Sequence, residues 1–567
     1  MNTILVAINS KFSHSNLAVR YLSDYLRKQT QIKSSFLELT INQDVEHMIS
    51  KILEHKPDAV GFSCYIWNID LVLRIAETIK IGNSGILIIL GGPEVSFDSA
   101  KTMEKYPFVD FIIRGEGELP LNQLIATLNE KKTLESIRGL TYRSNNTIVV
   151  NDDQKSYVPL DDLDYPYAEN EDFSNQYIYY ETTRGCPFNC SYCLSSSEQG
   201  VRKLSLERIH EDIIKLVRTR ANAVKLVDRT FNFDQKRAME IMSLIVSVNH
   251  NNMKFHMEMT AEIMDEAFVA FINELPVDMF QFEIGVQSTN PETLSAVNRR
   301  SDYQTLSGIT RKIIAGKNAH VHLDLIAGLP LESYDLFKKS FNDIYKLKAE
   351  KLQLGFLKVL KGTRIRNDAE FYGIRYLDKA PYEVVKTDHI SLTELLFLKR
   401  IEKLVTLYYD EHYFSNTLDE IMAFAEPFDF FEDFARYWTR HDLYDSYHKK
   451  SLLFDIIYDY ILERYQYDIR DSLLDDFLLS ERNTEIPKYL YDKEEKKYAH
   501  LKHDLLNNLD FKSTYFQNQI YVPNKKLVND FRLIEKNNEY HAYVYGDKNN
   551  IFSRSKKINV TILLQGE

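Results

Sequence analysis

The sequence has few cysteines, few glycines and prolines, and no long apolar run. Only 4 of its 567 residues are Cys, 19 are Gly and 14 are Pro, which excludes a disulfide scaffold, a collagen-like chain and low-complexity disorder. No apolar stretch approaches the roughly eighteen residues of a membrane span, and no charged segment followed by a long apolar core opens the chain. We therefore expect a soluble cytoplasmic protein without a membrane partner.

An excess of basic charge is also missing. The net charge is −12 and the pI is about 5.8, which disfavours a nucleic-acid partner. The sequence is 44% hydrophobic and 27% charged, which is typical of an ordered globular protein. Its length predicts roughly two to four domains.

Residues 1–145 alternate apolar runs with amphipathic segments. The expected strands are residues 3–8, 34–39, 59–63, 85–90 and 108–113, and the expected helices between them include 17–28 and 45–55. Continuous apolar strands separated by helices predict a parallel sheet covered on both faces, which is a doubly wound α/β domain. Ligands of such domains bind at the carboxyl ends of the strands. A polar, acidic stretch at 146–176 reads as a linker.

A second α/β region is expected at residues 177–378. Its strand candidates are 177–182, 223–227, 254–259, 278–284, 320–326 and 351–357. Six βα units predict a partial (β/α)6 barrel with its reactive groups at the strand carboxyl ends. Residues 379–567 carry apolar and aromatic residues at helical spacing, which predicts a mostly helical C-terminal domain.

Three of the four cysteines stand within eight positions, in Arg184-Gly-Cys-Pro-Phe-Asn-Cys-Ser-Tyr-Cys193. Thiolates are soft ligands that suit iron-sulfur clusters or zinc, but a tetrahedral zinc site needs a fourth Cys or His nearby. The next histidine, His210, lies inside an expected amphipathic helix. Cys186, Cys190 and Cys193 can instead hold three irons of a [4Fe-4S] cluster and leave the fourth iron open for chemistry.

This C-x3-C-x2-C loop resembles that of the radical S-adenosylmethionine (SAM) superfamily, including the aromatic Tyr192 before the last cysteine. The resemblance implies that SAM binds the open iron and is cleaved to a 5′-deoxyadenosyl radical. Further motifs resemble the subgroup with an N-terminal B12-binding domain: Val227-Asp-Arg-Thr-Phe-Asn-Phe-Asp234, Glu283-Ile-Gly-Val-Gln-Ser288, Asn298-Arg-Arg300 and Asp324-Leu-Ile-Ala-Gly-Leu-Pro330. The helical C-terminal region resembles uncharacterised extensions of that subgroup.

The resemblance implies SAM contacts at the strand ends of the barrel. Besides Tyr192, we place Glu283, Gln287 and Ser288 near the SAM ribose and Arg300 near its carboxylate. Arg299 competes with Arg300 for that role, and Glu283 is equally compatible with a structural ion pair. Many radical SAM proteins hold the SAM amino group with Gly-Gly-Glu after the second strand. Here Asp228-Arg-Thr-Phe231 stands instead, as in the B12-binding subgroup, and the residue that contacts the amino group is left open.

Two glycine-containing strand-end loops of the first domain, Leu90-Gly-Gly-Pro-Glu-Val-Ser96 and Arg114-Gly-Glu-Gly-Glu118, let a bulky ligand approach the backbone. With Gly61-Phe-Ser-Cys64 they resemble a cobalamin-binding domain, which implies cobalamin contacts from Ser63, Gly91, Gly92, Glu94, Gly115 and Glu116. The Asp-x-His-x-x-Gly pattern that supplies a cobalt-ligating histidine in many B12 domains is absent. His14 is the only histidine in the corresponding loop. A degenerate domain without cofactor therefore remains an alternative.

The reading that these features favour is a cobalamin-dependent radical SAM methyltransferase acting on an unactivated carbon of an unknown substrate. An electron donor such as flavodoxin or ferredoxin is the expected partner. The alternative enzyme is a non-methylating radical SAM cyclase or rearrangement enzyme. A tRNA methylthiotransferase is disfavoured because its second cluster needs three N-terminal cysteines and only Cys64 is present. A non-catalytic corrinoid carrier would have no use for the cysteine loop.

Overall fold

The computed structural model describes the chain except for residues 31–32, 131–132, 146, 169–170, 175, 198–199, 252, 494, 517–520, 547–554 and 566–567. The chain forms two compact units, Met1–Leu395 and Leu396–Glu567. Asn146, where we expected the linker to begin, lies outside the described residues. None of the described helices is long and apolar enough to cross a membrane.

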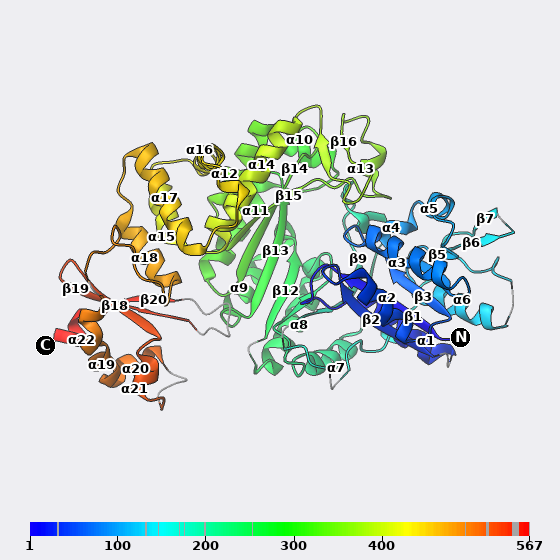
Figure 1. Cartoon of the computed structure of the whole chain (residues 1–567), viewed down its shortest axis with the longest axis horizontal. Coiled ribbons are helices and arrows are strands. Elements are labelled where there is room, and N and C mark those ends of the chain that lie inside the picture. Colours follow the sequence, from blue (N-terminus) through cyan, green and yellow to red (C-terminus); the bar gives the residue numbers. More distant parts are fainter. Residues whose placement is uncertain are drawn as a thin grey trace. The chain divides into compact units, whose positions relative to one another are not determined.

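The first unit opens with a doubly wound sheet of order β2-β1-β3-β4-β5-β6-β7 (Figure 1). Its strands are β1 (Thr3–Asn9), β2 (Ser34–Thr40), β3 (Ala59–Ser63), β4 (Leu87–Gly91), β5 (Phe111–Ile113), β6 (Leu140–Ser144) and β7 (Thr147–Val150). Its helices are α1 (Leu17–Thr30), α2 (Val45–Glu54), α3 (Ile69–Gly82), α4 (Pro93–Ser96), α5 (Ser99–Lys105) and α6 (Glu118–Glu130). Because the chain turns one way from β1 to β2 and the other way from β3 onward, a ligand crevice is expected at the ends of β1 and β3.

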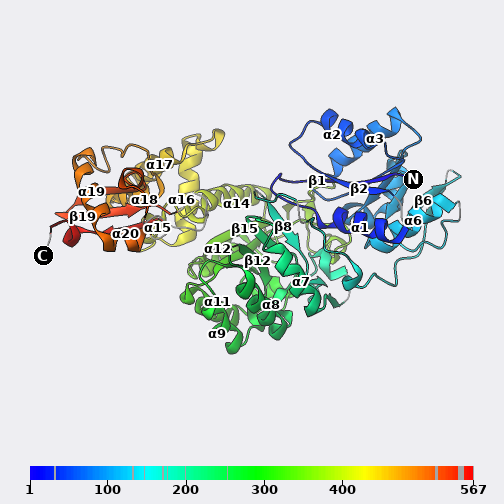
Figure 2. The same ribbon diagram turned by 90° about the horizontal axis from the view of Figure 1, so that it is seen from below.

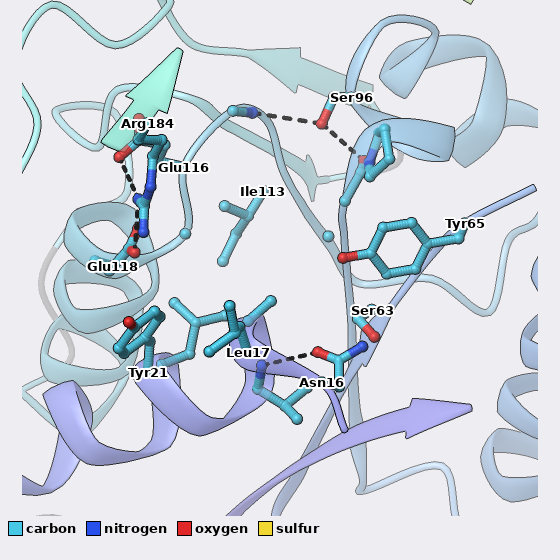
Figure 3. A pocket seen from close by; sticks show the side chains of 18 of the residues that line it. Asn16, Leu17, Tyr21, Ser63, Tyr65, Ser96, Ile113, Glu116, Glu118 and Arg184 are labelled. Carbon is cyan, nitrogen blue, oxygen red and sulfur yellow. Dashed lines mark hydrogen bonds and ion pairs between the residues drawn. The ribbon is translucent and has the colours of Figure 1, made fainter. Parts of the chain in front are cut away.

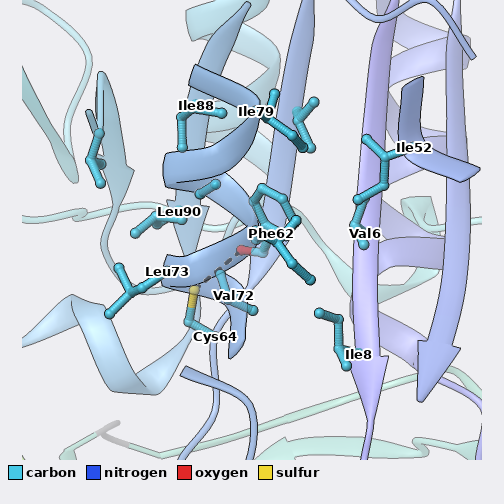
Figure 4. Close-up of a cluster of buried hydrophobic side chains, with 14 of the residues drawn as sticks. Val6, Ile8, Ile52, Phe62, Cys64, Val72, Leu73, Ile79, Ile88 and Leu90 are labelled. Carbon is cyan, nitrogen blue, oxygen red and sulfur yellow. Dashed lines mark hydrogen bonds between the residues drawn. The ribbon is translucent and has the colours of Figure 1, made fainter. Parts of the chain in front are cut away.

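Both faces of this sheet are covered, and the central strands β1 and β3 are buried at every position. Ile4, Val6 and Ile8 of β1 point into a core formed with α2 and α3, which Figure 4 shows around Phe62 and Cys64. Leu5 and Ala7 of the same strand point into a second core formed with α1 and α6. The Cys64 thiol donates to the carbonyl of Phe62 at 3.7 Å, and burial raises its pKa well above the ordinary value. Cys64 is therefore an inert core thiol.

Two strands extend this sheet beyond the sequence expectation. β6 and β7 pair antiparallel at the edge of the sheet, and β7 lies inside the stretch from 146 that we expected to be linker. The stretch that follows is tied back to the first domain by Arg20, whose buried guanidinium donates to the carboxylates of Glu38 and Glu171 and to the carbonyl of Pro166. One acidic residue of this stretch, Glu171, therefore forms an ion pair with the first domain.

The barrel part of the first unit is a parallel sheet of order β15-β14-β13-β12-β11-β8. Its strands are β8 (Tyr177–Tyr180), β11 (Ala223–Leu226), β12 (Lys254–Met259), β13 (Phe280–Gln287), β14 (His320–Ala327) and β15 (Lys351–Phe356). Its helices are α7 (Leu206–Leu216), α8 (Gln235–Val248), α9 (Glu266–Glu274), α10 (Pro291–Ala296), α11 (Tyr303–Gly316) and α12 (Tyr334–Tyr345). Helices α8, α9, α11 and α12 gather on its outer side (Figure 2). This is the predicted partial (β/α)6 barrel.

Alternation along the barrel strands separates an apolar outer face from a polar inner face. In β13, Phe280, Phe282, Ile284 and Val286 are buried, whereas Gln281, Glu283, Gly285 and Gln287 are half-buried on the other face. Because partners in parallel strands point to the same side, the matching inner residues of β12 and β14 line one surface with those of β13. The inner surface of the barrel is therefore polar and ionisable.

Short elements complete the first unit: β9 (Thr183–Gly185), β10 (Val201–Lys203), α13 (Arg364–Asn367), β16 (Arg375–Tyr376) and β17 (Val384–Lys386). The second unit is helical over most of its length, as expected, with α15 (Ser415–Ile421), α16 (Pro427–Arg440), α17 (Lys450–Tyr465), α18 (Arg470–Ser480), α19 (Ala499–Asn507), α20 (Leu509–Tyr515), α21 (Asn524–Leu527) and α22 (Thr561–Gln565). α14 (Leu392–Leu404) spans the boundary between the units. Near its end, the second unit also has an antiparallel sheet of β18 (Phe531–Lys536), β19 (Glu539–Val544) and β20 (Lys556–Asn559) that periodicity did not predict.

Candidate active site

A cavity of about 1050 Å³ opens at the carboxyl ends of the first domain's strands. Asn9, Ser63 and Gly91, at the ends of β1, β3 and β4, line it from the first domain. Arg184 and Gly185, directly before the first cysteine of the cysteine loop, line it from the barrel. The expected crevice of the doubly wound sheet and the mouth of the barrel are therefore one space (Figure 3).

The wall of the cavity that the first domain forms carries small residues, which leave room for a bulky ligand. Gly92 has φ +106°, and a Cβ there would lie 2.7 Å from the carbonyl oxygen of Cys64, so no other residue fits without strain. Ser96 Oγ donates to the carbonyl of Gly92 at 2.9 Å and accepts from the backbone N–H of Gly115 at 3.4 Å, which ties the two glycine loops together. Among the residues that the structure describes, the buried hydroxyl of Ser63 has no hydrogen-bond partner, so it is available to a bound group.

An ion-pair cluster joins the first domain to the start of the cysteine loop. Arg184 Nη1 donates to Glu116 at 2.7 Å and to Glu118 at 2.9 Å, and its Nη2 donates to Glu181 at 2.6 Å. Figure 3 shows Arg184 between Glu116 and Glu118. Arg202 also donates to Glu116. Burial and the neighbouring Glu118 raise the pKa of Glu116, against the attraction of Arg184 and Arg202.

The cysteine loop is held from three sides, which fixes the positions of its thiols. At its start, the fully buried carboxylate of Asp228 accepts from the backbone N–H of Thr182 at 3.0 Å and from the hydroxyls of Thr182 and Thr183 at 2.6 Å each. In its middle, the N–H of Ser191 donates to the carbonyl of Val297 at 2.9 Å, and the carbonyl of Ser191 accepts from the N–H of Ile365 at 2.9 Å. Asp228 therefore supports the loop backbone rather than pointing at a ligand.

Arg299 is the arginine that reaches the cysteine loop. Its Nη1 lies 3.9 Å from Cys190 Sγ and 3.5 Å from the Tyr192 hydroxyl, and its Nη2 donates to the carbonyl of Gly285. Arg300, which we predicted near the SAM carboxylate, is exposed. Cys190 is buried, whereas Cys186 and Cys193 are half-buried, and burial raises the pKa of Cys186.

The carboxylate of Glu283 lies on the inner face of the barrel. It accepts from His256 Nε2 at 2.7 Å and from Lys225 Nζ at 3.4 Å. Burial would raise its pKa, but the His256 hydrogen bond and the Lys225 charge bring the pKa of Glu283 down to about 2. Glu258, its partner across β12 and β13, has Arg229 as an opposite charge at 3.9 Å. Glu283 therefore forms the ion pairs expected of a structural carboxylate, and it also faces the interior of the barrel.

The other predicted SAM residues of β13 differ in exposure. Gln287 has φ +71° at a β-bulge of β13, and its buried Oε1 has no hydrogen-bond partner in the described part of the chain. Ser288 is 1% exposed and its hydroxyl donates to Glu332 Oε1 at 2.5 Å. Burial raises the pKa of Glu332 to about 8. Gln287 is therefore available to a ligand, whereas the Ser288 hydroxyl already has a partner on the outer side of the strand end.

Of the predicted cobalamin residues, Ser63, Gly91, Gly92, Gly115 and Glu116 line the cavity. Glu94 is 3% exposed and faces away from it. Its carboxylate accepts from the Tyr382 hydroxyl and lies 3.2 Å from Lys361 Nζ, so it binds the segment that follows β15. His14 lines the cavity, but its Nδ1 is hydrogen-bonded to the Tyr179 hydroxyl.

Three comparisons with known proteins agree with this geometry. Residues 180–366 match the model of the radical SAM superfamily, and residues 3–125 match the B12 binding domain. The chain therefore has a radical SAM domain. It carries a B12-binding domain before the radical SAM domain. Residues 370–554 match a protein family of unknown function, DUF4080.

Relatives of this radical SAM protein include the cobalamin-dependent radical SAM methyltransferase TokK of Streptomyces tokunonensis, 26% identical over 362 residues. That match covers 60% of this chain and 52% of TokK, so the chain spans about half the length of this relative. An anaerobic magnesium-protoporphyrin IX monomethyl ester cyclase of Rubrivivax gelatinosus is 28% identical over 196 residues, 31% of this chain and 34% of the cyclase. The solved structure of the cobalamin-dependent enzyme OxsB shares the fold with a TM-score of 0.59 and 16% identity, over 93% of this chain and 84% of OxsB.

Sequence reasoning did not single out several residues that position the site of the radical SAM domain. From the sequence, Asp228 stands out only as a departure from Gly-Gly-Glu. Its position shortly after β11 could have indicated a carboxylate that accepts from backbone N–H groups. Arg184 stands two residues before Cys186, so its place in the cysteine loop was visible. Two of its three carboxylate partners, Glu116 and Glu118, could not be predicted because they lie on the other domain.

Proposed function

We propose that the chain is a cobalamin-dependent radical SAM methyltransferase that acts on an unactivated carbon. The observation that carries the proposal is the single cavity, which Ser63, Gly91 and Gly115 line from the B12-binding domain and Arg184 and Gly185 line from the start of the cysteine loop. A corrinoid and SAM bound at these walls would face the same space. In such an enzyme the cluster and SAM supply a carbon-centred radical on the substrate, and cobalamin supplies the methyl group.

The residues present fit these groups. Cys186, Cys190 and Cys193 stand on a loop whose backbone is fixed by Asp228 and Val297, and they would hold the [4Fe-4S] cluster. Gln287 and Glu283 on the inner face of β13 would contact SAM, together with Tyr192 beside the last cysteine. Ser63, Gly91, Gly92, Gly115 and Glu116 would contact cobalamin, and Ser63 has a buried hydroxyl that is free to bind.

The chain itself positions the reactants. The ion pairs of Arg184 with Glu116 and Glu118 hold the B12-binding domain against the cysteine loop, which keeps the two walls of the cavity in register. Arg299 places positive charge beside Cys190, and it also donates a hydrogen bond to the carbonyl of Gly285 in β13. Walls fixed in this way hold the bound groups in a defined orientation relative to each other.

Product analysis tests the methyl transfer. The full chain, reconstituted with iron, sulfide and hydroxocobalamin under anaerobic conditions, is incubated with SAM, dithionite and candidate substrates. Methyl transfer predicts S-adenosylhomocysteine alongside 5′-deoxyadenosine, both measured by mass spectrometry. If substrate is consumed and 5′-deoxyadenosine forms without S-adenosylhomocysteine, the methyltransferase proposal is wrong. The non-methylating alternative below then replaces it.

A non-methylating cyclase or rearrangement enzyme is the second candidate. The similarity to the Rubrivivax gelatinosus cyclase over 196 residues favours it, as does the absence of the histidine pattern of many B12 domains. For either reaction we infer a reduced protein electron donor such as flavodoxin or ferredoxin, because SAM cleavage consumes an electron. We also infer a cytoplasmic location, because cluster thiolates persist in a reducing compartment.

A further inference from the structure

The loop that follows β1 lies against β8, an edge strand of the barrel sheet. The N–H of Tyr177 donates to the carbonyl of Ser13 at 2.7 Å, and the N–H of Ser15 donates to the carbonyl of Tyr177 at 3.4 Å. His14 is thereby paired with Tyr177 in a parallel bridge. Because paired residues of parallel strands point to the same side, the His14 imidazole lies on the face of the sheet that carries Tyr177 and Tyr179.

Hydrogen bonds from buried side chains hold this loop in place. Asn9 Nδ2 donates to the carbonyl of His14 at 2.9 Å. The Tyr167 hydroxyl lies 3.0 Å from Ser15 Oγ and accepts from the N–H of Tyr179 at 2.9 Å. Asn9, Ser15 and Tyr167 are all buried. The backbone of His14 is therefore fixed by the fold and does not need a ligand to hold it beside β8.

The hydrogen bond between Tyr179 and His14 determines which ring nitrogen carries the proton. Burial raises the pKa of Tyr179 to about 12, so the hydroxyl keeps its hydrogen. Burial and the charges of Lys11 and Lys225 lower the pKa of His14, so the imidazole is neutral near pH 7. Among the described residues the Tyr179 hydroxyl has no other acceptor, so it donates to Nδ1 of His14. The ring proton of the neutral imidazole is then on Nε2.

The Nε2–H of His14 is a donor without a protein acceptor. No residue in the described part of the chain accepts from it, and His14 lines the cavity that the two domains share. The charges that act on His14 most strongly, those of Lys11 and Lys225, are both positive. The positive potential that disfavours a proton on the imidazole favours a negative group beside it. The ligand group that fits this donor best is therefore an anionic oxygen.

We propose that the Nε2–H of His14 binds a carboxylate of the substrate, so that this enzyme acts on a carboxylic acid. A carboxylate forms a charge-assisted hydrogen bond with one N–H donor and gains from the nearby lysine charges. A phosphate group would bring further acceptor oxygens, for which His14 has no second donor. The inference rests on the proposed function, because it takes the shared cavity as the place where the substrate meets SAM and cobalamin.

Binding of a small carboxylate tests the proposal without turnover. The full chain, reconstituted with its cluster and hydroxocobalamin, is titrated with radiolabelled butyrate in equilibrium dialysis, and with butanol and butylammonium in parallel. We expect saturable butyrate binding in the millimolar range and at least tenfold weaker binding of the other two. His14→Ala should weaken butyrate binding at least tenfold. The matched control is His47→Ala, at an exposed position of α2 in the same domain, and it should leave butyrate binding unchanged.

The donor itself is tested by His14→Gln, which keeps an N–H group near the position of Nε2. This variant should retain at least a third of the wild-type affinity for butyrate. A loss as large as that in His14→Ala would overturn the proposal, and so would unchanged butyrate binding in His14→Ala, as expected for butyrate bound to cobalt. Circular dichroism verifies that each variant folds.

The same titration in saturating SAM distinguishes the substrate from SAM as the source of the carboxylate. Retained butyrate binding supports the proposal, and complete displacement by SAM overturns it. Butyrate binding that occurs only before hydroxocobalamin is added also overturns it, because the corrinoid then occupies the site. These wild-type titrations decide the matter even if a variant does not fold. Failure of SAM cleavage in a separate assay would count against the proposed function and leave the butyrate result standing.

Discussion

The guanidinium of Arg184 lies 2.7 Å from the carboxylate of Glu116, across the junction between the B12-binding domain and the cysteine loop. Both side chains are largely buried, at 17% and 12% exposure, and Glu118 and Glu181 complete the cluster. Removing one partner of a buried charge network leaves the others uncompensated, which costs about 3–5 kcal/mol.

We expect Arg184→Gln to lower the stability of the first unit by an amount of that order and to make the chain between the two domains sensitive to protease. Differential scanning calorimetry and limited trypsin digestion measure the two effects. Arg364→Gln, on the exposed side of α13, is the matched control and should behave as wild type. An unchanged thermal midpoint for Arg184→Gln would show that the cluster does not join the domains.

Removal of the cysteines should abolish the cluster and SAM cleavage together. The variant with Cys186, Cys190 and Cys193 all changed to Ala should bind no iron after anaerobic reconstitution and should form no 5′-deoxyadenosine, because the thiolates are the iron ligands. Iron content and the visible charge-transfer absorption of the iron-sulfur cluster measure iron binding. Mass spectrometry measures 5′-deoxyadenosine. Cys64→Ala should retain both properties. A triple variant that kept its iron would contradict the assignment.

Arg299 and Arg300 should differ sharply although they are neighbours. Arg299→Gln removes the charge beside Cys190 and the donor to Gly285, and loss of such outer contacts at metal sites typically costs about 10- to 100-fold in affinity or activity. Arg300→Gln changes an exposed side chain and should cost little. The rate of 5′-deoxyadenosine formation per bound cluster measures both. The reverse order of effects would return the predicted SAM contact to Arg300.

Cobalamin should bind without a protein imidazole on cobalt, because the Asp-x-His-x-x-Gly pattern that supplies the cobalt-ligating histidine in many B12 domains is absent from the sequence. We expect His14→Ala to retain hydroxocobalamin through gel filtration and to leave the cobalt(II) electron paramagnetic resonance spectrum without imidazole nitrogen coupling, as in wild type. Ser63→Leu narrows the cavity and should reduce retention, whereas Ser243→Leu on the exposed side of α8 should not. Imidazole coupling in wild type that disappears in His14→Ala would overturn the prediction.

The buried carboxyl of Glu332 should make stability fall as the pH rises. Its pKa is about 8 in the folded chain and near 4.5 when unfolded, so the folded state holds a proton that the unfolded state has lost between these values. The free energy of unfolding therefore falls by up to about 1.4 kcal/mol per pH unit from pH 4.5 to pH 8 and then levels off. Glu332→Gln removes this group, so its thermal midpoint relative to wild type should improve between pH 6 and pH 8. A constant difference between the two proteins across this range would count against the assignment.

The sequence predicted the elements whose signals are local. The cysteine spacing identified the loop, and apolar runs located the parallel strands of both sheets to within a few residues. What it could not predict depends on distant partners or on one backbone angle. Asn298 has φ +52°, and this turn sends Arg299 rather than Arg300 toward Cys190. Glu94 shares a glycine loop with Gly92, yet a tyrosine from beyond β15 turns it away from the cavity. The strand β7 continues a sheet through residues whose composition resembled a linker.

The contact of Glu94 with Tyr382 also bears on how the chain folds during synthesis. The two residues are separated by 288 positions, and Lys361, which pairs with the same carboxylate, by 267. At about 5–20 residues per second, the ribosome exposes Glu94 roughly 15–60 s before Tyr382 emerges. From the moment β7 emerges until Tyr382 does, the B12-binding domain has all its strands, but the Glu94 carboxylate still lacks its partners. Its final closure is therefore a late, long-range step, and substitutions at Tyr382 should slow maturation of a domain to which Tyr382 does not belong.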